Sequence, residues 1–217
     1  ETTTKIIVMP NTPVEIRRIE LKNLGNSEEI IEVNTFFEPI LSTFEQDYSH
    51  KAFNNLFLTY EFLDDSNILL VKRKARDEKQ KDIFMAVNLF TESDTIGELE
   101  YEIDKEKYIG RQNIGLPIAV ENSIPLSRKV QMSLDPVVAM RRTIKVLPSQ
   151  KAVLNLIISV SENREDAINN VKENMNNEKI LRNTNLVKAK VDAESMYLGI
   201  KAKDIENYQN MLRYVLF

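Results

Sequence analysis

Length, composition and charge already exclude several classes of function. The chain has 217 residues, of which 42% are hydrophobic, and its formal net charge is −4 at pH 7. A chain of this size can bury the core of one large domain, and its acidic balance predicts no nucleic-acid partner and no anionic membrane surface as partner. It holds no cysteine, which excludes disulfides and thiolate metal ligands and fits a cytoplasmic location. No apolar run is long enough to insert into a membrane.

The amino-terminal part of the sequence alternates between apolar and polar residues, which is the pattern of half-buried β-strands. Strands are expected at residues 5–9, 14–24 and 29–37, with a β-bulge at Arg17-Arg18, where the alternation changes parity. Because turn residues separate them, these three strands are predicted to form one antiparallel meander.

Residues 38–55 break this alternation and are expected to form an irregular loop or a short helical turn. A hairpin of strands at 56–63 and 68–73 follows. Residues 72–82 are mostly charged, so they are interpreted as a solvated connection. Further strands are expected at 83–90 and from residue 97, and a helical turn at 104–108.

The stretch 133–160 is predicted to lie at the centre of the fold. Asp135 before Pro136 favours a turn, because proline restricts the preceding residue and a short carboxylate can accept bonds from nearby backbone N–H groups. Asp135 and Arg141 are therefore interpreted as structural residues of the turn that leads into the next strand. The apolar run 152–160 predicts a strand buried on both faces, joined to its predecessor by a tight turn at Pro148.

After residue 160 the apolar spacing changes from two residues to about 3.6, which indicates helices. Asn163 is a candidate helix N-cap, and a second helix is expected over about 178–196. A third helix over 203–216 has the clearest apolar stripe and ends near Phe217, which suggests that the natural protein continues. The predicted organisation is an antiparallel β-sandwich over 1–160 and helices over 161–217. The helices are expected to follow the strands rather than to be interspersed among them.

Residues suited to catalysis or metal binding are sparse. Histidine occurs once, at His50, so neither a Ser-His-Asp triad nor a multi-histidine metal site can be assembled. The 33 acidic residues are too many to single out a catalytic pair, and no glycine-rich phosphate loop is present. Arg141 and Arg142 are adjacent on a strand, so they face opposite sides and cannot form one clamp. No catalytic residue, metal or cofactor is therefore predicted.

Four motifs, in the same order along the chain, resemble one family. His50-Lys51-Ala52-Phe53-Asn54-Asn55-Leu56-Phe57 is similar to the His-Pro-Ala-Phe-x-x-Leu-Phe stretch in the β-sandwich part of glycoside hydrolase family 94, formerly glycosyltransferase family 36. Tyr108-Ile109-Gly110-Arg111 resembles its Phe-Leu-Gly-Arg. Leu134-Asp135-Pro136 with Arg141-Arg142 resembles its Leu-Asp-Pro-x-x-x-x-Arg-Arg, and Asn163-Arg164-Glu165-Asp166-Ala167 its Ser-Arg-Glu-Glu-Ala. Lys51 and Gln112 depart from the proline and the glycine that are usual in the family.

The resemblance is closest to the modules of cyclic β-1,2-glucan synthases and β-1,2-oligoglucan phosphorylases. It implies a supersandwich of the galactose-mutarotase kind, followed by linker helices that lead into an (α/α)6 barrel where the family's catalytic acid and phosphate site lie. The expected function is that of a non-catalytic accessory domain. Its candidate partners are a β-linked glucan, the catalytic barrel and a second copy of the chain. A parent enzyme of the synthase kind would be attached to the inner membrane.

A second class of function stays open, namely an independent carbohydrate-binding or protein-interaction β-sandwich. Exposed aromatic residues would favour glucan binding, although the lack of tryptophan disfavours a dedicated sugar-binding platform. Tyr108, Arg111 and His50 are the candidate carbohydrate or interdomain residues. Arg111 follows a glycine and is expected either to project toward the barrel or its glucan, or to form an ordinary salt bridge. A lone histidine such as His50 is also typical of a packed loop residue.

Overall fold

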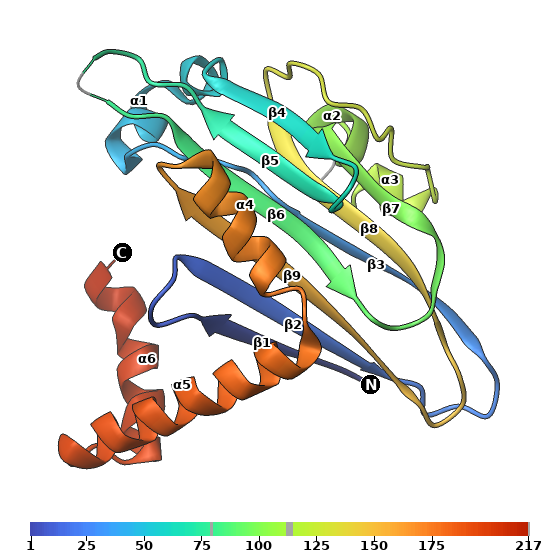
Figure 1. Ribbon diagram of the computed structural model, residues 1–217, viewed down its shortest axis with the longest axis vertical. Coiled ribbons are helices and arrows are strands. Elements are labelled where there is room, and N and C mark those ends of the chain that lie inside the picture. The colour runs from blue at the N-terminus through green and yellow to red at the C-terminus, as the bar shows by residue number, and fades with distance from the viewer. Residues whose placement is uncertain (79, 112–114, 217) are drawn as a thin grey trace. The chain divides into compact units, whose positions relative to one another are not determined.

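The computed structural model describes residues 1–78, 80–111 and 115–216, so Gln112 and Phe217 lie outside the described residues (Figure 1). Internal contacts divide the chain into two compact units, Glu1–Met175 and Asn176–Phe217. The strands are β1 (Thr2–Val8), β2 (Val14–Lys22), β3 (Glu29–Phe37), β4 (Leu58–Leu63), β5 (Ile68–Arg73), β6 (Ile83–Thr91), β7 (Thr95–Asp104), β8 (Pro136–Val146) and β9 (Lys151–Ser161). The helices are α1 (Phe44–Asn55), α2 (Lys105–Tyr108), α3 (Ile118–Glu121), α4 (Arg164–Glu173), α5 (Asn177–Tyr197) and α6 (Ala202–Leu216).

The larger sheet of the first unit has six antiparallel strands in the order β1-β2-β9-β6-β5-β4 (Figure 1). Strand β9, the most apolar run in the chain, lies between β2 and β6, with Ile157 opposite Ile16 and Ile158 opposite Val87. Ile157 and Leu154 are fully buried. The prediction of a central strand with both faces covered is therefore confirmed for β9.

The smaller sheet has three antiparallel strands in the order β3-β8-β7, so the predicted meander of the first three strands is wrong. Strand β3 leaves β2 and pairs with β8, with Val33 opposite Arg142. The amide of Asn23 donates to the carbonyls of Ser27 at 2.8 Å and Val146 at 3.0 Å, and so ties the β2–β3 connection to the end of β8. Alternating apolar residues show that a strand has one buried face but not which sheet it joins.

The tight turn predicted at Pro148 is present, but the two strands that it joins do not pair with each other, because the chain changes sheets there. Strand β8 belongs to the three-stranded sheet and β9 to the six-stranded sheet. The turn between them is tight, since the backbone N–H of Gln150 donates to the carbonyl of Leu147 at 3.1 Å and Ser149 has a positive φ of 60°. A short connection thus joins two layers instead of two neighbouring strands.

The core lies between the two sheets and follows the period-two alternation of the strands. In β5, Leu69 and Val71 are fully buried on the face toward the smaller sheet, where they join the main apolar cluster. Phe62 of β4 stacks on Tyr101 of β7, with 4.2 Å between ring centroids. Each fully buried side chain of this kind contributes roughly 1.5–3 kcal/mol, which makes the sandwich the main source of stability. The expected fold of antiparallel β-sheets with helices at the carboxyl-terminal end is confirmed.

Helix α4 packs on β6 and β9 and belongs to the first compact unit, although the sequence placed it in the helical region after residue 160 (Figure 1). Asn163 caps it as predicted, because its side-chain oxygen accepts two backbone N–H groups of the first turn at 2.8 and 3.2 Å. Ala167, Ile168 and Val171 form the buried stripe. Helix α4 therefore covers the outward face of the larger sheet.

Helices α1, α2 and α3 lie among the strands, so the expectation that all helices follow the strands is wrong. The segment predicted as a loop or helical turn contains the 12-residue helix α1, whose first turn carries Glu45 and Asp47. Few of its residues are buried, and this helix therefore lacks the broad apolar stripe by which helices are recognised in a sequence. The helical turn expected at 104–108 is present as α2.

The second compact unit consists of α5 and α6, separated by Gly199 with a positive φ of 68°. A left-handed residue of this kind is common where a helix ends. Tyr208, Met211, Leu212 and Val215 of the predicted stripe on α6 are exposed. Within the described residues, no helix combines the length and the apolar character needed to cross a membrane.

Candidate functional site

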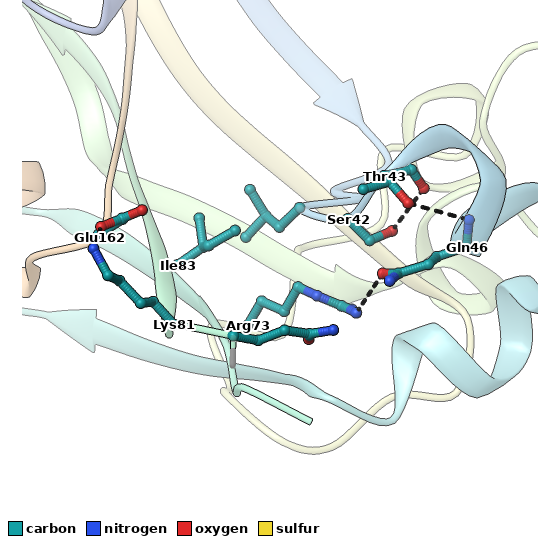
Figure 2. Close-up of a pocket in the computed structure, with 9 residues that line it drawn as sticks. Ser42, Thr43, Gln46, Arg73, Lys81, Ile83 and Glu162 are labelled. Atoms are coloured by element: carbon teal, nitrogen blue, oxygen red, sulfur yellow. Dashed lines mark hydrogen bonds and ion pairs between the residues drawn. The ribbon is translucent and has the colours of Figure 1, made fainter. Parts of the chain in front are cut away.

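A cavity of about 440 Å³ lies where β5 and β9 end and β6 begins, at the end of the sandwich closed by the segment that leads into α1. Figure 2 shows hydroxyl and amide side chains on one side of it and Lys81 with Glu162 on the other. Its volume falls within the range of small-molecule sites. The lining residues are Leu41, Ser42, Thr43, Gln46, Arg73, Gln80, Lys81, Ile83 and Glu162.

Helix α1 positions the amide side of the cavity. Thr43 caps the helix, since its hydroxyl oxygen accepts the backbone N–H of Gln46 at 3.4 Å. His50 interrupts the helix with φ −149° and ψ 65°. The buried amide of Asn54 donates to the carbonyls of Gln46 and His50, and so satisfies backbone groups that the interruption leaves free. Asn55, also buried, donates to the carbonyl of Leu134 at 3.1 Å and fastens the helix end to the sandwich.

Arg73 is the central polar group of the cavity. It lies on the same face of β5 as two core residues and is only 4% exposed. Its Nη2 donates to side-chain oxygens of Gln46 at 3.3 Å and Asn54 at 3.4 Å, while its Nη1 is buried and has no partner within the described residues. The guanidinium also lies 5.8 Å from the ring of Phe57. Burial, with repulsion from Arg76, lowers the pKa of Arg73 below its usual value.

Opposite Arg73, Lys81 and Glu162 form an exposed ion pair at the mouth of the cavity (Figure 2). The wall also includes the apolar side chain of Ile83. The cavity therefore combines one buried cation, one exposed ion pair, and several neutral hydroxyl and amide groups. Such a set can hydrogen-bond a polyhydroxylated or an anionic small molecule.

Two exposed aromatic residues lie on the outer face of α1. Phe44 and Tyr48, 80% and 83% exposed, stack on each other with ring centroids 5.8 Å apart. Residues four apart share one face of a helix, and Gln46, two residues from each of them, points to the opposite face. These rings therefore form a surface separate from the cavity.

The candidate His50 is exposed at the interruption of α1 rather than packed into a loop. Its carbonyl oxygen, and not its ring, has a described hydrogen-bond partner. It is absent from the lining of the cavity. In the structure His50 therefore marks the interruption of α1, and its described contact is made by its backbone and not by its ring.

The candidate Tyr108 is a core residue and does not reach the surface. It is fully buried in a small cluster with Ala119, Leu126, Val137 and Ala139. Its hydroxyl has no hydrogen-bond partner within the described residues, and burial raises its pKa to about 12. Tyrosine was expected at a sugar-binding or interdomain surface, but the four-residue helix α2 turns this side chain inward.

The candidate Arg111 forms the ordinary salt bridge that was one of its two expected roles. Its Nε lies 2.8 Å from a carboxylate oxygen of Glu106, and its Nη2 donates to the other oxygen at 3.1 Å. The Arg111 side chain is 81% exposed. An exposed pair of this kind contributes little to stability, and the guanidinium remains accessible to solvent.

Asp135 closes the turn before β8 through its backbone, which corrects the expected side-chain bonds to backbone N–H groups. Its carbonyl accepts the N–H of Lys105 at 3.1 Å and the hydroxyl of Ser133 at 3.1 Å. Its carboxylate is 60% exposed and lies 3.7 Å from the ammonium group of Lys105. The proline that follows ends the turn and starts β8.

Arg141 lies within β8 and holds a neighbouring segment rather than the turn. Its Nε donates to the side chain of Asn34 at 2.8 Å, and its Nη1 and Nη2 donate to the carbonyls of Ile124 and Ala119 at 2.8 Å each. Glu32 balances its charge at 3.1 Å. The side chain is buried, so Arg141 fastens α3 and the residues after it to the smaller sheet.

The residues brought together at the cavity were not singled out from the sequence. Arg73 and Lys81 fall in the segment interpreted as a solvated connection, and Gln46 in the segment interpreted as a loop or turn. A signal for Arg73 was present, because it continues the alternation of Leu69 and Val71 on the inner face of β5. No group of three or more His, Cys, Asp or Glu side chains that could hold a metal occurs in the described part of the chain.

Comparison with known proteins identifies the family. Residues 1–177 match the family model described as the glycosyl hydrolase 94 supersandwich domain. The cyclic β-(1,2)-glucan synthase NdvB of Rhizobium meliloti (strain 1021) is 24% identical over 214 residues, which are 97% of this chain and 8% of that protein. The chain thus spans a small part of the length of this relative. Since the family model covers most of the sequence and its name agrees with the antiparallel architecture, the chain belongs to the glycosyl hydrolase 94 supersandwich family.

Proposed function

We propose that this chain is a non-catalytic accessory domain of a glucan-active enzyme and that its cavity beside α1 holds part of a β-linked glucan. Membership of the supersandwich family and the similarity to a cyclic glucan synthase support the class of enzyme. The observation that carries glucan binding is the cavity itself, which has a suitable volume and is lined by seven polar or charged residues and two aliphatic ones.

The lining suits sugar hydroxyl groups. Gln46 and Gln80 offer amide groups that donate and accept, and Ser42 and Thr43 offer hydroxyls that do the same. Arg73 adds donors in a planar fork. Leu41 and Ile83 in the same wall can contact the apolar C–H face of a pyranose ring. A glucan unit would thus find both kinds of contact in one cavity.

Calorimetric titration of the chain with linear β-1,2-gluco-oligosaccharides tests this proposal. Gln46→Ala removes a lining amide and is expected to weaken binding about 2- to 10-fold, the effect of one hydrogen bond. Tyr48→Ala is the matched control, because it changes the opposite face of the same helix and should leave the affinity unchanged. Loss of affinity in Tyr48→Ala with none in Gln46→Ala would move the site to the aromatic face and overturn the cavity assignment.

The non-catalytic part of the proposal has its own test. Incubation of the chain with β-1,2-glucan and phosphate should release no glucose 1-phosphate. Turnover that disappears when a carboxylate of this chain is replaced, for example in Glu162→Gln, would contradict the accessory role. In the proposed arrangement the chemistry belongs to an (α/α)6 barrel, and this domain contributes substrate contact and assembly.

A protein-interaction role is the second candidate, and the exposed stripe of α6 favours it. Tyr208, Met211, Leu212 and Val215 place apolar surface on one helix face. Such a stripe is typical of a face that packs against another helix or chain. Sedimentation velocity over a range of concentrations would detect self-association, and Met211→Glu should abolish it if the stripe is the contact. A monomer at all concentrations would remove the second copy of the chain from the proposed partners.

A further inference from the structure

Arg73 is a buried cation that no described carboxylate balances. It is 4% exposed, and none of the ion pairs in the described part of the chain involves it. Its two side-chain hydrogen bonds are long, at 3.3 and 3.4 Å, and go to the neutral amide oxygens of Gln46 and Asn54. Removing a charge from water is costly unless an opposite charge or strong hydrogen bonds replace the water. The surroundings of Arg73 therefore favour an anion.

The net charge of the cavity lining also favours an anion. Its lining carries two cations, Arg73 and Lys81, and one carboxylate, Glu162. Figure 2 shows the guanidinium of Arg73 extending across the cavity toward Gln46, with Lys81 and Glu162 at the other end. Arg76 adds further positive charge close to Arg73.

We infer that the cavity binds a small ligand through an oxyanion group, either a phosphate or a carboxylate, held by Arg73. A guanidinium can donate two parallel bonds to such a group. The oxyanion would replace the two long bonds to the amide oxygens of Gln46 and Asn54. Lys81 lies at the other end of the cavity and is paired there with Glu162, so these two residues change the affinity for an anion through the net charge of the cavity and not by contact. This site goes beyond the proposed glucan role and does not depend on it.

Titration of the full chain with inorganic phosphate, followed by ¹⁵N-correlated NMR, tests the inference. Sodium chloride keeps the ionic strength constant, so that general screening is removed from the signal. Saturable shifts confined to the backbone amides that line the cavity, such as those of Ser42, Thr43 and Gln80, are the expected result. A parallel titration with acetate distinguishes a phosphate site from a carboxylate site. No saturable shift with either anion would overturn the inference.

Three variants and one control then assign the contacts. Arg73→Gln should weaken anion binding roughly 10- to 100-fold, the effect of losing charge-assisted hydrogen bonds, and Lys81→Gln should weaken it less. Glu162→Gln should strengthen it, because it removes the carboxylate from the cavity lining. Arg17→Gln removes an exposed cation outside the cavity and should have no effect. Arg73 is buried, so its replacement can unfold the domain. Lys81 and Glu162 are exposed, and the opposite effects expected for Lys81→Gln and Glu162→Gln therefore test the inference even if Arg73→Gln does not fold.

The outcomes separate this inference from the proposed function. Weaker anion binding in Glu162→Gln, or unchanged binding in a folded Arg73→Gln, would contradict the inference. Binding of a neutral β-1,2-gluco-oligosaccharide without any anion binding would overturn the anion site and leave the glucan role intact. Anion binding without glucan binding would support the anion site and contradict glucan binding at the cavity.

Discussion

Replacing Arg141 with glutamine is predicted to destabilise the sandwich strongly. The buried guanidinium makes three hydrogen bonds of 2.8 Å, two of them to the carbonyls of Ala119 and Ile124, and lies 3.1 Å from Glu32. Replacing the guanidinium costs about 3–5 kcal/mol in total, because each buried acceptor left without its donor costs about 1–3 kcal/mol. For a chain of this size, each kcal/mol corresponds to about 2–4 °C in melting temperature. The melting temperature of Arg141→Gln should therefore fall by roughly 6–20 °C.

Urea unfolding followed by circular dichroism measures the free energy, and hydrogen exchange of residues 118–124 reports whether this segment loosens first. Lys145→Gln is the matched control, since Lys145 lies on the same strand and the same face but pairs with Glu28 at the surface, at 2.7 Å. It should change the free energy of unfolding by less than about 1 kcal/mol. A stability loss in Arg141→Gln no larger than that of the control would refute the role assigned to Arg141.

Three further substitutions test the corrected side-chain environments. Asp135→Ala should lower the free energy of unfolding by less than about 1 kcal/mol in chemical denaturation, because its carboxylate is exposed and its 3.7 Å ion pair is weak. Tyr108→Phe should leave the melting temperature unchanged or raise it, since it removes a buried hydroxyl without a described partner. The pKa of Asp82 is lowered by hydrogen bonds from Lys72 and from the N–H of Ala75, so its contribution is present above its unfolded pKa and is lost as pH falls through the lower folded pKa. Asp82→Asn should therefore reduce the loss of stability on acidification, measured by unfolding at a series of pH values.

The sequence predicted those elements whose signal is local. Asn163 could be assigned as a helix cap because an Asn directly before acidic residues is a local signal for the start of a helix. In the structure its side-chain oxygen accepts two backbone N–H groups. The run 152–160 could be assigned as a central strand because only burial on both faces tolerates so many apolar residues. The neighbours of a strand in a sheet cannot be predicted from a local signal, because pairing depends on residues far away in the chain. Strand β3 therefore had the right limits and the wrong neighbour.

The cavity could not be predicted for a related reason. The composition of residues 72–82 predicted a charged connection, and all of the described residues in it except Arg73 are exposed or partly exposed. Arg73 is the exception, because the period of β5 turns it inward with Leu69 and Val71. Helix α1 was missed because its helix signal is a cap and two acidic residues, without an apolar stripe. The alternation of the strand, extended two residues beyond the apolar run that ends at Val71, would have placed Arg73 on the inner face.

The motifs that resemble the family occur mainly in the scaffold of this domain. Tyr108 fills the core, Arg141 holds the α3 segment, Asn163 caps α4, and Asn54 and Asn55 fix helix α1. Most of the cavity lining comes from outside these motifs. Replacing motif residues should therefore change the melting temperature more than ligand affinity. Replacing exposed lining residues should do the opposite.

This division separates the residues that hold the fold from the residues that the proposed ligand would contact. A supersandwich stabilised by buried amides and by Arg141 can carry different side chains around the cavity without loss of the fold. Gln46, Lys81 and Glu162 lie at the wall of the cavity and are not part of the apolar core. Their replacement should therefore change the free energy of unfolding little. Arg73 is both a scaffold residue and a lining residue, because it is buried and also lines the cavity. The charge that it brings to the cavity is therefore part of the fold, whereas the exposed lining residues can be replaced with less effect on stability.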